Sequence, residues 1–235
     1  MLKYQKIAKH IEEYIEQNSL KQGDKLPRLE EFVAYFDAGK STIRRSLSLL
    51  ENKGILYQQH GSGIFVRTPK ERGYIDLSFN RGFAYEFSDY ELSNKLLAIE
   101  IREATDEVAK NLNITTADKV HYVKRLIFVD KQPLCIEESH YLVSVIPYLD
   151  AGIASASIFA HLQQNLNLKF GFSDAFLVVD KLNKEEAKLL ELKTGDPRPC
   201  LINTFYLSDR TPFNYSNTVF HYQQSKFFVP VVKNL

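Results

Sequence analysis

The N-terminal part of the chain repeats apolar residues every three or four positions in three separate segments. This spacing gathers apolar side chains on one stripe of a helix and is typical of amphipathic helices. We predict helices over about residues 2–17, 29–36 and 40–52, with a turn over 21–27 and a break over 37–39. The apolar stripes consist of Tyr4, Ile7, Ala8, Ile11 and Ile15, then Leu29, Phe32, Val33 and Phe36, then Ile43, Leu47 and Leu50.

Two short extended segments follow the third helix and are joined by a turn rich in glycine. Residues 55–59 and 64–66 are the predicted strands, and His60-Gly61-Ser62-Gly63 lies between them. A glycine-bearing turn between two such strands predicts a β-hairpin. Three helices and a hairpin form a winged helix-turn-helix, whose third helix fits the major groove of DNA while the hairpin lies against the neighbouring backbone.

The charge of the chain is distributed unevenly between its two parts. Residues 1–72 hold 13 Lys and Arg against 9 Asp and Glu, whereas residues 73–235 hold 17 against 20, so a net charge of +1 conceals a basic N-terminal part. Lys40 and Arg44 are one turn apart at the start of the third helix and lie on its polar side. A solvated helix face would explain such a cluster, but its place before a glycine-bearing hairpin favours contact with DNA.

The order of these motifs resembles the GntR-family DNA-binding domain over residues 1–67. The motifs that carry the resemblance are Tyr4-Gln5-Lys6-Ile7-Ala8, Gly23-Asp24-Lys25-Leu26-Pro27, Lys40-Ser41-Thr42-Ile43-Arg44-Arg45-Ser46-Leu47, Leu50-Glu51-Asn52-Lys53-Gly54-Ile55 and His60-Gly61-Ser62-Gly63-Ile64-Phe65-Val66. The resemblance implies DNA contacts from Arg28, Lys40, Ser41, Thr42, Arg44, Arg45, His60, Gly61, Ser62 and Gly63.

Two positions depart from the family pattern. Where the family usually has Ser-Glu-Arg, this chain has Arg28-Leu29-Glu30, which puts a carboxylate in the place of a guanidinium. Where the family usually has Ser-Arg, it has Gly39-Lys40, and Lys cannot form the bidentate fork that Arg makes with guanine. We therefore expect either reduced affinity for DNA or an operator that differs from the common family sequence.

Residues 67–75 contain Pro69, Gly73 and mixed charges, which predicts a linker over 68–75 and a second domain over 76–235. The second domain alternates strands with helices, so we predict an α+β fold with an antiparallel sheet. The predicted helices cover 105–112, 157–166 and 184–192, and the predicted strands cover 121–129, 134–141, 175–180, 200–206 and 213–220.

This element order resembles the UTRA ligand-sensing domain of HutC-type members of the family, which has the chorismate lyase fold. The matching segments are Val123-Lys124-Arg125-Leu126, Gln132-Pro133-Leu134-Cys135-Ile136-Glu137, Ser157-Ile158-Phe159-Ala160-His161-Leu162 and Phe213-Asn214-Tyr215-Ser216. The resemblance implies a pocket for a small effector between the sheet and its helices. The candidate effector-binding residues are Arg81, Gly82, Phe83, Arg125, Glu137, Ser157, Phe159, His161, Tyr215 and Ser216.

The chemistry of these candidates leaves alternatives open. Ser157 begins a helix, where it either caps the helix or helps to hold an anion at the positive helix end. Arg125 lies among apolar neighbours and must meet either Glu137 on the adjoining strand or an anionic effector. The Arg-x-Arg of relatives that bind sugar phosphates is broken here by Ile127, and Asn214 stands where a Glu is common. The effector is thus less charged than a sugar phosphate, or held differently.

Composition limits the remaining function classes. An apolar fraction of 44% and a charged fraction of 25% are those of a globular protein, and no apolar run is long enough to span a membrane, so we expect a cytoplasmic protein. The two cysteines have no metal-site spacing, and we expect neither a metal nor a cofactor. The six scattered histidines form no catalytic set with Ser, Asp or Cys.

These observations predict a homodimeric, non-enzymatic transcriptional regulator, and we expect a repressor. Its partners are a palindromic double-stranded DNA operator and a small metabolite such as a sugar or sugar phosphate. Two alternatives remain: an enzyme that uses the chorismate lyase-like fold, and a degenerate winged helix that contacts proteins. A steep salt dependence of DNA binding would separate the regulator from the second alternative.

Overall fold

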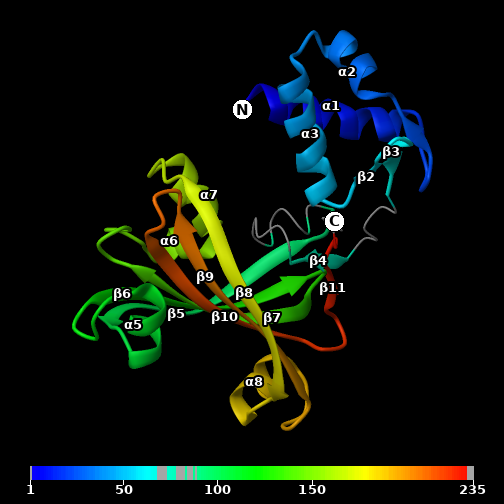
Figure 1. Ribbon diagram of the computed structural model, residues 1–235. Helices are drawn as coiled ribbons and strands as arrows, with labels where there is room; N and C mark the ends of the chain where they lie inside the picture. Colours follow the sequence, from blue (N-terminus) through cyan, green and yellow to red (C-terminus); the bar gives the residue numbers. More distant parts are fainter. Residues whose placement is uncertain (1, 68–72, 78–82, 84–86, 88, 232–235) are drawn as a thin grey trace. The chain divides into compact units, whose positions relative to one another are not determined.

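The computed structural model describes residues 2–67, 73–77, 83, 87 and 89–231. The chain divides into two compact units, one formed by residues 1–79 with 227–235 and the other by residues 80–226 (Figure 1). Among the described residues, no helix is both long enough and apolar enough to span a membrane.

The first unit contains the predicted helices and hairpin. The helices are α1 (Lys3–Gln17), α2 (Leu29–Phe36) and α3 (Lys40–Asn52). Strands β2 (Leu56–Gln59) and β3 (Gly63–Val66) form the wing hairpin and pair in antiparallel fashion. The bounds of all three helices agree with the sequence prediction to within about one residue, because the apolar stripe is unbroken in each.

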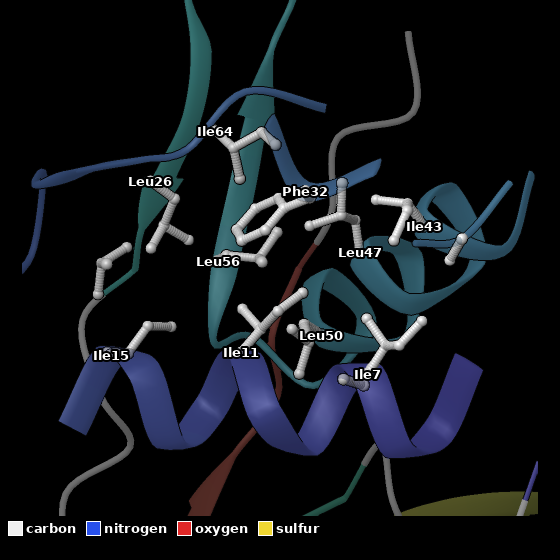
Figure 2. Close-up of a cluster of buried hydrophobic side chains, with 13 residues drawn as sticks. Ile7, Ile11, Ile15, Leu26, Phe32, Ile43, Leu47, Leu50, Leu56 and Ile64 are labelled. Atoms are coloured by element: carbon white, nitrogen blue, oxygen red, sulfur yellow. The ribbon is translucent and has the colours of Figure 1, made fainter. Parts of the chain in front are cut away.

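The predicted apolar stripes form the core of this unit. Figure 2 shows Ile7, Ile11 and Ile15 of α1 facing the side chains of α3 and the wing. A hydroxyl joins the same helices, since Ser46 Oγ on α3 lies 2.9 Å from the carbonyl oxygens of both Tyr4 and Thr42 and shares its one proton between them. The core therefore fixes the orientation of α3 relative to α1.

Three short strands were not predicted from the sequence. Residues Lys25–Leu26, within the predicted turn, form β1, which pairs with β3, so the wing sheet has the order β1-β3-β2 in the described chain. Residues Tyr74–Asp76 form β4, which pairs with β11 (Lys226–Phe228), so the end of the predicted linker is extended strand. Strands of two or three residues are too short to show an alternating pattern.

The second unit is built on an antiparallel sheet with the order β5-β6-β7-β10-β9-β8 in the part of the chain that the structure describes. This confirms the predicted antiparallel α+β fold. The strands are β5 (Leu92–Glu103), β6 (Lys119–Val129), β7 (Gln132–Leu142), β8 (Phe170–Lys181), β9 (Pro197–Leu207) and β10 (Pro212–Phe220). Strand β5 was not predicted, because charged residues and a bulge between Leu96 and Ala98 interrupt its alternation.

Helices cover both faces of this sheet (Figure 1). On one face, α6 (Ala151–Ser155) and α7 (Ile158–Gln164) pack against Val123, Tyr141 and other apolar residues, and we call this the α7 face. On the opposite face, α5 (Asp106–Leu112) and α8 (Lys184–Leu189) pack against the alternate residues of the same strands, and we call this the α5 face. Since neighbours along a strand point to opposite faces, each strand residue is assigned to one face.

Candidate DNA interface and effector site

The start of α3 presents basic side chains to solvent, as the sequence predicted. Lys40 and Arg44 are exposed and stand one turn apart on the same side of the helix, and Ser41 and Arg45 are exposed as well. Thr42 is half-buried. The helix begins directly after Gly39, so its positive dipole end adds to the charge of these side chains.

Two of these cations already have partners within the unit. The Arg45 guanidinium lies over the ring of Tyr4, at 4.1 Å from the ring centroid. Lys40 Nζ lies 3.6 Å from Glu30 Oε1, and both side chains are more than half exposed. Glu30 on α2 and Lys40 on α3, the two residues that depart from the family pattern, thus face each other. An ion pair between exposed side chains contributes little to stability. Among the described residues no ion pair or ring contact holds Arg44.

The wing turn depends on backbone that favours glycine. Gly61 has φ of 73° and Gly63 has φ of 132°, both outside the range that L residues adopt easily. A Cβ on Gly63 would lie 2.7 Å from Cε of Lys25, so this lysine side chain lies directly beside the turn. His60 and Ser62 at the tip are exposed. Lys25 is an additional cation at the wing, which the sequence did not reveal because β1 was not foreseen.

The remaining predicted DNA contact, Arg28, is exposed and occupies the N-cap position of α2, where its backbone N–H donates to Glu31 Oε2. A cavity of about 620 Å³ lies nearby, between α1 and α2. Two carboxylates in its lining disfavour a phosphate ligand, and no residue predicted to contact DNA lines it. The lining residues are His10, Glu13, Tyr14, Gln17, Pro27, Glu31, Phe32, Tyr35 and Phe36.

In the second unit, Arg125 meets Glu137, which was one of its two predicted alternatives. Its Nε donates to Glu137 Oε2 at 2.9 Å, and its Nη2 donates to the same oxygen. Its Nη1 donates to the carbonyl oxygens of Ala154 at 2.9 Å and Ala156 at 3.2 Å. Burial opposes the charge of Arg125, yet the Glu137 carboxylate outweighs it and the guanidinium pKa is raised. Arg125 therefore ties the junction between α6 and α7 to the sheet.

Ser157 follows this junction and caps α7. Its Oγ accepts a hydrogen bond from the backbone N–H of Ala160 at 3.3 Å, and its side chain is exposed. Asn94 of β5 supports the same junction, since its Nδ2 donates to the carbonyl of Ser155 at 2.9 Å. The fold thus brings Arg125, Glu137 and Ser157 together, with Asn94 as a neighbour that the sequence did not indicate.

The α7 face of the sheet carries buried polar groups beside Glu137. Ser139 and Tyr141 follow Glu137 at alternate positions of β7, and Asn203 of β9 lies in line with Ser139 across β10. Within the described chain, Ser139 Oγ, Tyr141 Oη and Asn203 Oδ1 make no hydrogen bond of regular geometry, although Ser139 is near enough to Tyr141 to affect its pKa. Burial raises that pKa. We call Ser139, Tyr141 and Asn203 the polar strip. Buried polar atoms normally have partners, so the polar strip is suited to a polar ligand.

Of the other predicted effector residues, Ser216 and Phe83 lie on or beside the α7 face. Ser216 lies between Ser139 and Asn203 in the strand register. Phe83 contacts Phe220, whose strand position assigns it to the same α7 face, with ring centroids 6.2 Å apart. Arg81 and Gly82 lie outside the described residues.

Phe159 and His161 lie on α7. Phe159 packs edge-on against Phe205 and Phe170, with ring centroids 4.9 Å and 5.3 Å apart, so its contacts are those of a core residue. His161 is half-buried. Both side chains belong to the helix that covers the polar strip.

Tyr215, a predicted effector residue, does not lie with Arg125, Glu137 and Ser216. Its neighbour Ser216 is on the α7 face, and strand alternation turns Tyr215 to the α5 face. There its hydroxyl donates to Glu107 Oε1 of α5 at 2.5 Å, and its ring is in the α5 core cluster. The sequence segment correctly identified the strand, but only one of two adjacent residues can point to the α7 face.

Comparison with known families and proteins agrees with this architecture. Residues 3–66 match the family described as "Bacterial regulatory proteins, gntR family", and residues 88–226 match the UTRA domain. The chain is 48% identical to the uncharacterized HTH-type transcriptional regulator YydK of Bacillus subtilis, over 97% of each chain. It is 27% identical to the mannosyl-D-glycerate transport/metabolism system repressor MngR of Escherichia coli, over 95% of this chain and 93% of that one.

Solved structures show the same likeness. The crystal structure of YydK from Bacillus subtilis superimposes with a TM-score of 0.85 at 46% identity, over 99% of this chain and all of that one. The gene product SA0254 of Staphylococcus aureus gives a TM-score of 0.64 at 38% identity, over 68% of this chain and 99% of that one. These relatives are regulators rather than enzymes where their names state a function. The chain therefore belongs to the GntR family of bacterial transcriptional regulators and combines a GntR helix-turn-helix domain with a UTRA domain.

Proposed function

We propose that this regulator is a homodimeric repressor that is controlled by a small sugar-derived metabolite. Each winged helix reads one half of a palindromic operator, with Lys40 and Arg44 in the major groove and the wing at the neighbouring backbone. The metabolite binds on the α7 face of the UTRA domain. Its binding favours an arrangement of the dimer with lower affinity for the operator.

The observation that carries the DNA-binding part is the exposed basic start of α3. The apolar side of α3 is fixed in the core, so Lys40 and Arg44 can only face outward. The wing follows in the same unit, and Lys25 adds a third cation there. This is the arrangement of charge that contact with a phosphate backbone requires.

The effector class is inferred from the chemistry of the α7 face. Glu137 and two carbonyl oxygens take four of the five N–H donors of Arg125, and the Glu137 carboxylate balances its charge, which disfavours a phosphate at this residue. The groups available for a ligand are the neutral oxygens of Ser139, Tyr141 and Asn203, which suit a molecule with many hydroxyls.

Two relatives bear names that agree with this class. One is the mannosyl-D-glycerate repressor, and the other is the "Probable fructoselysine utilization operon transcriptional repressor" of Escherichia coli. Both names refer to sugar derivatives. We therefore propose a polyhydroxylated sugar derivative as the effector, and sugar phosphates serve as the competing class in the test.

A thermal-shift panel of sugars, sugar acids, amino-sugar conjugates and sugar phosphates tests this proposal. A ligand at a hundred times its Kd adds about 2.7 kcal/mol to stability. We expect a sugar derivative to stabilise the protein, Asn203→Ala to abolish the shift and the exposed Ser93→Ala to preserve it. A panel without any stabilising ligand, or a shift that Asn203→Ala leaves intact, would overturn the assignment of the site.

The coupling to DNA is tested with the same ligand. We expect it to weaken operator binding 5- to 150-fold, which corresponds to about 1–3 kcal/mol of coupling. A ligand that stabilises the protein but leaves operator affinity unchanged would contradict the proposed control.

A further inference from the structure

The cavity between α1 and α2 in the first unit is not used by the proposed function. Each helix contributes four lining residues, from His10 to Gln17 on α1 and from Glu31 to Phe36 on α2. Within each set, residues three or four positions apart lie on one side of their helix. The volume of about 620 Å³ lies within the range of about 300–1,000 Å³ that is typical of small-molecule sites. Among the described residues that line the cavity, none is a predicted DNA contact or effector residue.

Aromatic rings form most of this lining. The Phe36 ring stacks on those of His10 and Phe32, with centroids 6.1 Å and 6.0 Å apart. Tyr35 meets Phe36 edge-on, with centroids 4.9 Å apart and an angle of 89° between the ring planes. Tyr35 is 79% exposed, so a ligand can reach its ring. Ring faces attract cations through the ring quadrupole, and this wall therefore suits a cation with an apolar body.

The polar part of the lining is acidic. Glu13 and Glu31 contribute carboxylates, and the described lining residues include no Lys or Arg. Lys9 Nζ lies 3.6 Å from Glu13 Oε1, but both side chains are partly exposed and such a pair is weak. Glu31 Oε2 accepts a hydrogen bond from the backbone N–H of Arg28 at 2.5 Å, and no ion pair among the described residues involves Glu31. The cavity thus carries negative charge that its own lining does not balance, which disfavours anions and attracts cations.

The lining favours an organic cation over a metal ion. In the part of the chain that the structure describes, no group of three His, Cys, Asp or Glu side chains could hold a metal ion. Hard metal cations need a shell of oxygen ligands, which aromatic rings do not supply. An ammonium group is attracted by carboxylates and by ring faces alike, and its apolar substituents pack against the rings. The chemistry of the cavity therefore matches an ammonium ion carried on an apolar body.

We infer that the cavity between α1 and α2 binds an organic ammonium cation. The rings of Tyr35 and Phe36 contact its apolar part. The carboxylates of Glu13 and Glu31 balance its charge. This gives the DNA-binding unit a small-molecule site of its own, which differs from the polar strip in charge and in ligand class. The basic residues at the start of α3 do not line it, so the cation and DNA use different side chains.

Isothermal titration calorimetry on the full chain tests the class of ligand. The cationic probes are spermidine and benzyltrimethylammonium. Benzyl alcohol is the apolar control without charge, magnesium chloride is the charged control without an apolar body, and glucose represents neutral sugars. We expect at least one cationic probe to bind, with the three controls binding at least about 10-fold more weakly. No binding of either cationic probe, or binding of any control as tight as theirs, overturns the inference.

Variants locate the bound cation. Tyr35→Ala should weaken its binding about 2- to 30-fold, whereas Tyr35→Phe keeps the ring and should bind like wild type. Glu31→Gln should weaken it about 2- to 5-fold, because the amide oxygen can still accept from the Arg28 N–H and only the charge is lost. The exposed Glu16→Gln on α1 lies outside the lining and should change nothing. A cation that binds Tyr35→Ala and Glu31→Gln as tightly as wild type lies elsewhere, and the assignment to this cavity falls.

These results are distinguishable from those for the proposed effector. Asn203→Ala should abolish the thermal shift with a sugar derivative and leave the affinity for the cation unchanged. Tyr35→Ala should do the reverse. If cation binding instead fails in Asn203→Ala and persists in Tyr35→Ala, the cation occupies the α7 face and the inference is wrong, whereas a sugar panel without any stabilising ligand leaves it standing.

Discussion

At the scale of single residues, the ion pair of Arg125 and Glu137 determines how the proposed effector site is held. Both side chains are largely buried, with exposed fractions of 10% and 13%. Two carbonyl oxygens at the α6–α7 junction accept hydrogen bonds from Nη1 of Arg125. Arg125 is thus a positioning residue for the helix that covers the polar strip.

Loss of one partner of this pair should destabilise the second unit. We expect Arg125→Met to lower the free energy of unfolding by about 3–5 kcal/mol, because the Glu137 carboxylate is left buried without a partner. The exposed Lys95→Met on β5 should change it by less than about 0.5 kcal/mol. Chemical denaturation measures both values. An Arg125→Met variant as stable as wild type would show that the guanidinium does not hold the junction.

His140 makes stability depend on pH. Burial, together with Arg102 Nη2 at 2.9 Å from Nε2, lowers the pKa of His140 from 6.5 to about 4. Between these values the unfolded chain binds a proton that the folded chain does not, so stability is complete above pH 6.5 and declines as the pH falls towards 4. The decline attributable to this residue is up to about 3 kcal/mol.

The variant His140→Gln removes this contribution. We expect it to lose less stability than wild type between pH 7 and pH 4, whereas His60→Gln, at the exposed wing tip, should follow wild type. Denaturation at a series of pH values gives the comparison. Parallel curves for His140→Gln and wild type would exclude His140 as the source.

At the scale of elements, a glycine fixes the way the chain leaves α3. Gly54 has φ of 70°, and an added Cβ would lie 2.7 Å from Cβ of Pro230 and 3.3 Å from the ring of Phe228. Gly61 in the wing has φ of 73°, and nothing lies within 4 Å of its Cβ position. Both glycines thus have a left-handed backbone, but only at Gly54 would an added Cβ meet other atoms.

This difference yields a matched pair of variants. Gly61→Ala should lower the free energy of unfolding by about 1–2 kcal/mol, because a residue with a Cβ is strained in the left-handed backbone conformation. Gly54→Ala should cost more than this, because the new Cβ also displaces residues 228–230. Thermal and chemical unfolding measure both. Equal losses would mean that this segment does not pack firmly against Gly54.

The sequence predicted the elements with a clear apolar period and missed those without one, among them the 12-residue strand β5. Helices α1 and α3 and strands β6 and β7 have continuous apolar periodicity, and their bounds were predicted within about two residues. The two-residue β1 and the five-residue α6 offer too few positions for any period.

The candidate site, too, was predictable only where a local sequence pattern places its residues. The pairing of Arg125 with Glu137 was foreseeable because adjacent strands of a hairpin oppose them. The positions of Ser139 and Tyr141, two and four residues after Glu137, place them on the same face, and this signal was available. Asn203 was not predictable, because it reaches the site only through the register of two further strand pairs.

At the scale of the whole molecule, the proposed DNA binding depends on the positive charge at the start of α3. We expect Arg44→Ala to weaken operator binding by about 1–3 kcal/mol and, where it contacts phosphate, to reduce the salt slope by about 1. Lys9→Ala removes an exposed cation of α1 and should have little effect. Fluorescence anisotropy over a salt series measures both. Equal effects of the two variants would mean that general charge, rather than the start of α3, attracts DNA.

The pair of Glu30 and Lys40 bears on the operator that the protein prefers. Lys40 Nζ lies 3.6 Å from Glu30 Oε1, so the proposed DNA contact of Lys40 competes with Glu30. We expect Glu30→Gln to raise the affinity for DNA in general, since it removes a negative charge near phosphates. Binding of the variant to operator and to unrelated duplexes measures this gain. A loss of operator affinity alone would assign Glu30 a direct base contact instead.

The most direct test of the account compares the intact protein on two duplexes over a salt series. One duplex is a palindrome from the region upstream of its own gene, and the other has the same composition in scrambled order. We expect the palindrome to bind at least about 1,000-fold more tightly, with log affinity falling linearly with log salt. Equal affinity for the two duplexes, or binding that does not change with salt, would contradict the central claim that α3 and the wing read DNA.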